Sequence, residues 1–96
     1  MQREQPPGRC VLECWAPWCD SSRRVALHLA ELSAEPRRNL RFVRLDTEEK
    51  PETAAQYHVR VLPTVLLLEE DRVLARLEGE RSQGELARFC LVDHTK

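Results

Sequence analysis

The sequence lacks any long apolar run and any excess of one charge. Its apolar runs are no longer than Val65–Leu68, whereas a membrane-spanning helix needs about 20 apolar residues. Lys and Arg number 15 and Asp and Glu number 16, which gives a formal net charge of −1. A balance this even attracts neither nucleic acid nor anionic lipid strongly. We therefore expect no nucleic-acid partner and no membrane partner.

Glycine and cysteine are also scarce, with 3 and 4 residues among 96. Cys10, Cys14 and Cys19 lie within ten positions, whereas a secreted disulfide scaffold spreads more cysteines through a loop-rich chain. Together with Cys90 they favour thiols in a reducing compartment, so we expect a cytoplasmic protein. Hydrophobic residues make up 42% and charged residues 32%, a composition typical of one small globular domain.

Hydrophobic periodicity predicts one domain over residues 10–92. Residues 1–9 contain a Pro-Pro-Gly break and no periodicity, so we expect a flexible lead-in there and a tail over 93–96. Apolar residues recur at helical spacing after Asp20, and Ser82-Gln83-Gly84-Glu85 matches a capping box. The expected elements are strands at Cys10–Trp15, Leu40–Asp46, Thr64–Glu69 and Arg72–Glu78, and helices at Asp20–Ala34, Pro51–Tyr57 and after Ser82.

The order strand, helix, strand, helix, strand, strand, helix predicts an α/β fold. A right-handed crossover makes the first two strands parallel, and the last two strands form an antiparallel hairpin across Glu70-Asp71. Thr64–Glu69 is almost continuously apolar, which favours a central position with both faces covered. We therefore expect a four-stranded mixed sheet flanked by three helices.

The segment Trp15-Ala16-Pro17-Trp18-Cys19 lies where the first strand ends and the first helix begins. A thiol there faces unpaired backbone N–H groups and the positive end of the helix dipole, and both favour the nucleophilic thiolate. Arg23 would add positive charge if it folds back, whereas the carboxylate of Asp20 opposes a second negative charge. The sequence leaves the direction of the net pKa shift open. Both tryptophans are expected to be apolar anchors.

This segment resembles the active-site approach of the thioredoxin family. Val61-Leu62-Pro63-Thr64 is similar to that family's Ile-Pro-Thr segment, in which the proline is cis and faces the active cysteine. Gly79 lies where the family has a glycine near the substrate groove. The resemblance implies a thioredoxin-like fold over 10–92, with Cys19 as the attacking thiol. It also implies a substrate groove lined by Trp18, Val61, Leu62, Pro63, Thr64 and Gly79.

The second cysteine of the family's motif is missing. Thioredoxins read Trp-Cys-Gly-Pro-Cys, and this chain reads Trp18-Cys19-Asp20-Ser21-Ser22. Because a serine oxygen cannot close the internal disulfide that releases a substrate, we expect a monothiol Cys-x-x-Ser site. Cys19 would form a mixed disulfide with a protein or glutathione, and Ser22 would donate a hydrogen bond to the thiolate. The alternative is a redox-inactive binding or assembly module.

The resemblance also bears on one pair of charged residues and on one edge of the sheet. Glu13 aligns with the family's buried acid, and Arg44 falls where a lysine usually accompanies it. Without a resolving cysteine to deprotonate, we expect a partly buried Glu13–Arg44 ion pair. Only nine residues precede the first apolar strand, so the strand that would pair with Leu40–Asp46 is expected to be missing. That edge is either protected by its own charges or covered by a partner strand.

The remaining candidates carry weaker signals. Cys10, Cys14, Cys19 and His28 do not match the usual spacing of zinc ligands. The Cys-Gly-Phe-Ser motif and the later Gly-Gly pair of monothiol glutaredoxins are both absent from the sequence. We therefore expect no metal, iron–sulfur cluster or other cofactor. His58 replaces a glycine of the family and is expected to strain its turn.

Overall fold

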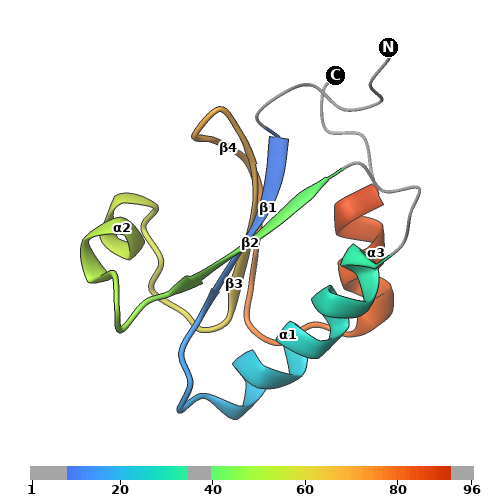
Figure 1. Ribbon diagram of the computed structural model, residues 1–96, viewed down its shortest axis with the longest axis horizontal. Coiled ribbons are helices and arrows are strands. Elements are labelled where there is room, and N and C mark those ends of the chain that lie inside the picture. The colour runs from blue at the N-terminus through green and yellow to red at the C-terminus, as the bar shows by residue number, and fades with distance from the viewer. Residues whose placement is uncertain (1–8, 35–39, 92–96) are drawn as a thin grey trace.

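The computed structural model describes residues 9–34 and 40–91, so most of the expected lead-in and the tail over 93–96 lie outside the described residues. The described residues form four strands and three helices in the predicted order (Figure 1). The elements are β1 (Arg9–Trp15), α1 (Asp20–Ser33), β2 (Arg41–Asp46), α2 (Pro51–Gln56), β3 (Thr64–Glu69), β4 (Arg72–Glu78) and α3 (Gln83–Leu91).

Four element boundaries differ by one residue from the prediction. Arg9 belongs to β1 rather than to the lead-in, because it pairs with Glu69 of β3, a contact that local sequence does not show. β2 begins one residue after Leu40. Ala34 and Tyr57 are the C-cap residues of α1 and α2, so neither continues its helix.

The strands form one mixed sheet in the order β2-β1-β3-β4. β1 and β2 are parallel, as a right-handed crossover through α1 requires. β3 pairs antiparallel with both β1 and β4. Five of the six residues of β3 are buried, which confirms the predicted central strand. The predicted four-stranded sheet is therefore confirmed.

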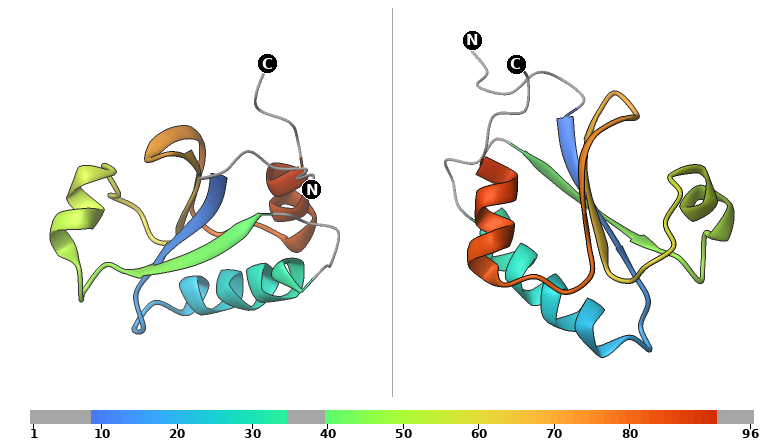
Figure 2. Two further views of the ribbon diagram at one scale, coloured as in Figure 1. Left: turned by 45° about the horizontal axis from the view of Figure 1, so that its top comes forward. Right: turned by 180° about the vertical axis from the view of Figure 1, so that it is seen from behind.

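The sheet separates two apolar layers. Helices α1 and α3 lie on one side of it and α2 lies on the other (Figures 1 and 2). Side chains alternate between the two faces of a strand. Accordingly, Val11 contributes to the layer under α1 and α3, whereas Cys10, Leu12 and Cys14 contribute to the layer that contains Ala54 of α2. The layer under α1 and α3 holds Val11, Val25, Leu29, Leu32, Val65, Leu67, Leu86, Phe89 and Cys90.

The local signals for turns and caps are confirmed. The Ser82 N–H donates to Glu85 Oε1 at 2.9 Å, and the Glu85 N–H donates to Ser82 Oγ at 3.1 Å, which is the predicted capping box. Glu70 and Asp71 have φ of 51° and 70°, as a type I′ hairpin turn requires. His58 has φ of 57°, a left-handed conformation that a non-glycine residue rarely adopts, so the expected strained turn is also confirmed.

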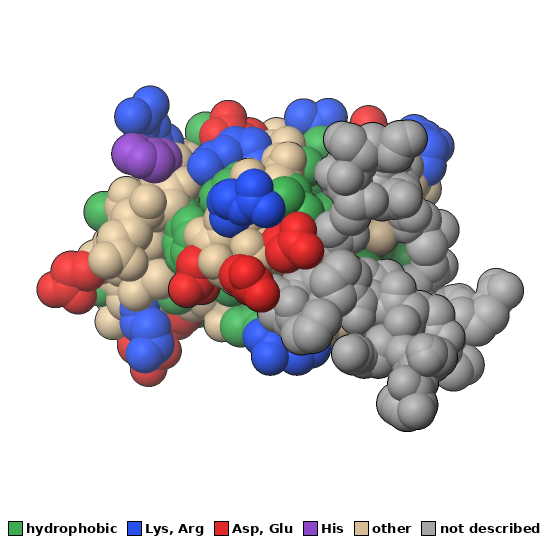
Figure 3. Space-filling view, turned by 90° about the horizontal axis from the view of Figure 1, so that it is seen from above, with side chains coloured by type: hydrophobic (Ala, Val, Ile, Leu, Met, Phe, Trp, Pro, Cys, Tyr) green, Lys and Arg blue, Asp and Glu red, His purple; other side chains and the backbone are tan. Residues whose placement is uncertain are grey.

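Charges of both signs are mixed over the face seen in Figure 3. Basic and acidic side chains lie close together around small apolar areas, in keeping with the even charge balance of the chain. None of the helices in the described part of the chain has the length and apolar character that crossing a bilayer requires.

Candidate active site at the start of α1

Cys19 is the N-cap residue of α1. Its backbone is extended, with φ of −99° and ψ of 112°, and its carbonyl accepts a bond from the Arg23 N–H at 3.2 Å. The Cys19 N–H donates to the Ala16 carbonyl at 3.1 Å, which closes a tight turn between β1 and the helix. The side chain caps no helical N–H. The thiol therefore lies at the positive end of the helix dipole.

The direct partner of the thiol is Ser21. Cys19 Sγ lies 3.3 Å from Ser21 Oγ, and the Ser21 hydroxyl is the largest cause of a lowered Cys19 pKa. The hydroxyl and N–H of Ser22 also lower this pKa, to a smaller extent. However, the Ser22 hydroxyl is fully buried and forms no hydrogen bond of ordinary geometry. The hydroxyl within hydrogen-bond distance of the sulfur is therefore that of Ser21, which no sequence motif marked, and not the Ser22 hydroxyl expected from the sequence.

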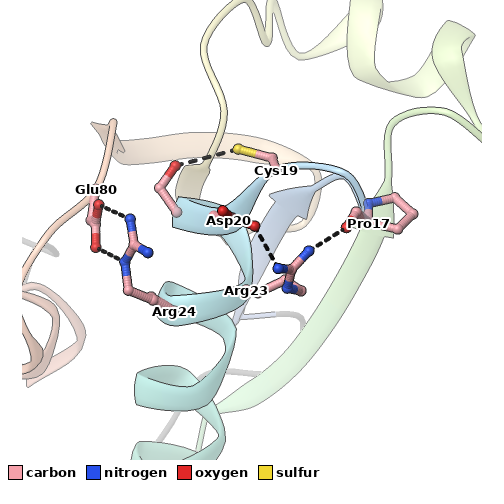
Figure 4. A network of polar contacts seen from close by, with 7 residues as sticks. Pro17, Cys19, Asp20, Arg23, Arg24 and Glu80 are labelled. Carbon is pink, nitrogen blue, oxygen red and sulfur yellow. Dashed lines mark hydrogen bonds and ion pairs between the residues drawn. The ribbon is translucent and has the colours of Figure 1, made fainter.

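Arg23 neutralises the carboxylate of Asp20, which was expected to oppose the Cys19 thiolate. Its guanidinium forms an ion pair with Asp20 at 2.5 Å and donates to the Pro17 carbonyl at 2.9 Å. Figure 4 shows this pair beside the Cys19 thiol at the first turn of α1. Arg23 therefore folds back toward the start of α1, as the sequence allowed. Its positive charge offsets the carboxylate of Asp20, which would otherwise oppose ionisation of the Cys19 thiol.

A second ion pair joins α1 to the loop after β4. Arg24 donates two hydrogen bonds to the carboxylate of Glu80, at 2.6 and 2.9 Å (Figure 4). The adjacent Gly79 has φ of 90°, which favours glycine, and its N–H donates to the Pro63 carbonyl at 2.8 Å. These contacts connect the Pro63 loop, the Gly79 loop and the start of α1 at one end of the sheet.

The strand register explains how Pro63 reaches this end. Cys14, near the end of β1, pairs with Thr64 at the start of β3, so the residue before Thr64 lies beside the turn that leads to Cys19. The Leu62–Pro63 peptide bond is cis, and the Thr64 hydroxyl donates to the Val61 carbonyl. Pro63 and Thr64 are buried, whereas Leu62 is half-buried. Pro63 and Thr64 can therefore offer mainly backbone groups to a ligand.

Trp18 is not the apolar anchor that the sequence predicts. It is 64% exposed, and its indole N–H donates to Glu48 at 2.7 Å. Val61 is also exposed, at 41%. This hydrogen bond joins residues 30 positions apart and holds the indole against the loop after β2, a contact that has no local sequence signal. Trp18 and Val61 are the exposed apolar side chains among the expected groove residues.

Glu13 and Arg44 form the predicted ion pair behind the site. Their register partners are each other, and Arg44 Nε lies 3.4 Å from Glu13 Oε1. The Arg44 guanidinium also stacks on Trp15, 4.0 Å from the ring centroid. Glu13 is only 6% exposed, and burial raises its pKa although Arg44 acts in the opposite direction. The second carboxylate oxygen, Oε2, is buried without a hydrogen-bond partner.

The other cysteines lie away from the thiol of Cys19. Cys10 and Cys14 are buried in the layer on the α2 side, and Cys90 is buried in the layer on the other side. Burial raises the pKa of Cys14 to about 12, so its thiol is not ionised at neutral pH. Within residues 9–34 and 40–91, no group of three or more His, Cys, Asp or Glu residues is placed to hold a metal ion.

Comparison with known proteins agrees with this geometry. Residues 3–91 match the family description of thioredoxin. The chain is 37% identical to thioredoxin of Bacillus subtilis over 83 residues, which cover 86% of this chain and 80% of that protein. It is 33% identical to thioredoxin of Listeria monocytogenes over 85 residues, which cover 88% of this chain and 82% of that protein.

A solved structure shows the same fold. Mitochondrial thioredoxin 3 of Saccharomyces cerevisiae, in its oxidized form, superposes with a TM-score of 0.75 at 26% identity, covering 86% of this chain and 76% of that one. The β-α-β-α-β-β-α arrangement predicted from the sequence is therefore confirmed as a thioredoxin fold. From its sequence match, its fold and the position of its cysteine, the chain belongs to the thioredoxin family.

Proposed function

We propose that Cys19 is a monothiol centre for thiol–disulfide exchange. The observation that carries this proposal is a partly exposed thiol at the start of α1 whose pKa is lowered by the Ser21 hydroxyl. Thiolate is the attacking form of cysteine, so a lowered pKa increases the reactive fraction at neutral pH. Proteins of this family generally act on protein disulfides.

The exchange begins when the Cys19 thiolate attacks one sulfur of a substrate disulfide. A bond forms between the two sulfurs while the substrate's own S–S bond breaks, and the departing thiolate takes a proton from solvent. The product is a mixed disulfide between Cys19 and the substrate. The exposed Trp18 and Val61 would hold apolar parts of the substrate, with Leu62, Pro63, Thr64 and Gly79 forming the rest of the groove.

Release of that mixed disulfide would require a thiol from outside the chain. Ser22 occupies the position of the family's second cysteine, and the thiol of Cys14 is buried and protonated. A glutathione thiolate would attack the Cys19 sulfur and free the substrate as a thiol. A second glutathione would then regenerate Cys19 and yield glutathione disulfide, so two external thiols are oxidised for each substrate disulfide reduced. This chemistry needs no metal or other cofactor, and it suits a reducing compartment such as the cytoplasm.

Disulfide reductase turnover tests the proposal with three proteins: wild type, Cys19→Ser and Ser22→Cys. With dithiothreitol as the reductant and insulin as the substrate, we expect low turnover from wild type, none above background from Cys19→Ser, and a clear gain from Ser22→Cys. The gain is expected because a cysteine at position 22 can close an internal disulfide. If Ser22→Cys gains nothing and wild type forms no mixed disulfide, the redox-inactive binding module is the better description.

A further inference from the structure

An exposed ion pair bridges the start of α1 and the loop after β4. Arg24 and Glu80 are 56 positions apart, and both oxygens of the carboxylate accept bonds from the guanidinium, at 2.6 and 2.9 Å. These bonds raise the pKa of Arg24 and lower the pKa of Glu80, so both groups are charged at neutral pH. A bidentate pair of this kind fixes orientation as well as distance.

The exposure of this pair indicates a local role. The side chain of Arg24 is 56% exposed and that of Glu80 is 42% exposed. Exposed ion pairs usually add little to the stability of a whole fold. No other ion pair between described residues joins α1 to the loop after β4. Loss of this pair should therefore change the position of the loop more than the stability of the fold.

The Glu80 end of the pair anchors the backbone of Gly79. Gly79 directly precedes Glu80, and its N–H donates to the Pro63 carbonyl at 2.8 Å. A Cβ atom at Gly79 would have no neighbour within 4 Å, so the space beside this residue is open. A peptide chain could therefore lie against the backbone here. The position of that backbone depends on the bond to Pro63 and on the ion pair of Glu80.

The Arg24 end of the pair is close to the reactive sulfur. Arg24 lies about one helical turn after Ser21, whose hydroxyl is 3.3 Å from Cys19 Sγ. The negative charge of a Cys19 thiolate contributes to the raised pKa of Arg24, so the guanidinium lies within electrostatic range of the sulfur. Figure 4 shows Arg24 reaching from α1 to Glu80 beside the turn that carries Cys19. The pair thus links the helical turn that carries the thiol to the loop that carries Gly79.

We propose that Arg24 and Glu80 are positioning residues for exchange with disulfides in extended peptide chains. Their ion pair holds the Gly79 loop at a fixed distance from the sulfur, and a chain docked against that loop presents its disulfide in line for attack. A small disulfide makes no contact with the loop and gains nothing from the pair. This inference rests on the proposed function of Cys19 and adds to it the residues that favour a peptide substrate.

Two disulfides with the same leaving group test the proposal. One is the pyridyl disulfide of the peptide Gly-Ser-Ala-Cys-Ala-Ser-Gly, blocked at both ends, and the other is the pyridyl disulfide of mercaptoethanol. In each, the Cys19 thiolate attacks the alkyl sulfur, a new S–S bond forms, and the old one breaks to release pyridinethiol, which takes a proton from solvent. The ratio of the two rates, peptide over small disulfide, cancels any change in the fraction of Cys19 present as thiolate.

Single, exchanged and control variants are compared by this ratio. Arg24→Gln and Glu80→Gln should each lower it by roughly fivefold, the largest effect usual for an exposed ion pair. The exchanged variant, Arg24→Glu with Glu80→Arg, re-forms the pair and should restore the ratio. Arg72→Gln is the matched control, because Arg72 pairs with Glu69 at the other end of β4, and its ratio should equal that of wild type.

An effect of charge on the thiol would give a different pattern. Glu80→Gln would leave Arg24 to stabilise the thiolate, whereas Arg24→Gln would remove that charge, so both rates would change in opposite directions in the two variants. An unchanged ratio in the single variants, a low ratio in the exchanged variant, or an equal fall in Arg72→Gln would overturn the proposal. If wild type and Cys19→Ser release pyridinethiol equally fast from the small disulfide, the proposed function itself fails.

Discussion

Replacing Glu13 with leucine is expected to stabilise the protein at neutral pH. The carboxylate is buried, one of its oxygens has no hydrogen-bond partner, and Arg44 contacts only the other oxygen. A buried polar atom without a partner costs about 1–3 kcal/mol. Because Arg44 is half-exposed, its pair with Glu13 contributes less than about 1 kcal/mol. Glu13→Leu should therefore raise the free energy of unfolding by about 1 kcal/mol or more.

The melting temperature, measured by circular dichroism, would show this gain. For a chain of this size, about 1 kcal/mol corresponds to a rise of about 4–8 °C. The gain should also depend on pH, because the folded-state pKa of Glu13 is raised above its ordinary value of 4.5. A carboxyl group whose pKa is raised by folding destabilises the folded protein increasingly as pH rises from its ordinary pKa to its folded-state pKa. The difference between Glu13→Leu and wild type should therefore grow as pH rises above 4.5.

Glu13→Gln is the matched control. It retains the shape and a polar end, so it should lose the pH dependence without the full gain in melting temperature. A lower melting temperature for Glu13→Leu at pH 7, or a difference from wild type that does not change with pH, would refute the reasoning. The first result would mean that the ion pair with Arg44 stabilises the fold more than burial destabilises it, and the second would mean that folding does not raise the pKa of Glu13.

Further predictions concern the thiols, one helix cap and the core. Ser21→Ala should raise the pKa of Cys19, measured by thiolate absorbance against pH, and an unchanged titration would exclude Ser21 as the main cause. In timed alkylation at pH 8, followed by peptide mapping, Cys19 should react well before Cys14, whose pKa is about 12. Modification of Cys14 before Cys19 would contradict this prediction. Ser82→Ala should lower the free energy of unfolding in urea by about 1 kcal/mol, because it removes the N-terminal cap of α3. Leu66→Ala should lower it by about 2–5 kcal/mol, since Leu66 is fully buried, and a smaller loss would indicate a looser core.

The sequence predicted the fold because its patterns are local. Alternation in Cys10–Trp15 placed Glu13 on the opposite face from Cys10 and Cys14, and the strand register confirms this. The capping box at Ser82 also depends only on residues three positions apart. Such signals act within one element, so no tertiary contact is needed to interpret them.

The details of the candidate site could not be predicted in the same way. Whether Ser21 or Ser22 contacts Cys19 depends on side-chain rotamers in the first turn of α1. Trp18 is exposed and its indole N–H donates to Glu48, 30 positions away, whereas tryptophan is usually buried. Contacts of this kind join residues far apart in the sequence and follow only from the packed structure.

Intact-mass spectrometry after incubation with glutathione disulfide tests the monothiol centre most directly. Wild type should gain the mass of one glutathione at Cys19 and keep it after the excess disulfide is removed, because no internal thiol can displace it. Ser22→Cys should lose the added glutathione as it forms a disulfide between positions 19 and 22. The account would be contradicted if wild type took up no glutathione at Cys19, or if it discharged the glutathione without an external thiol.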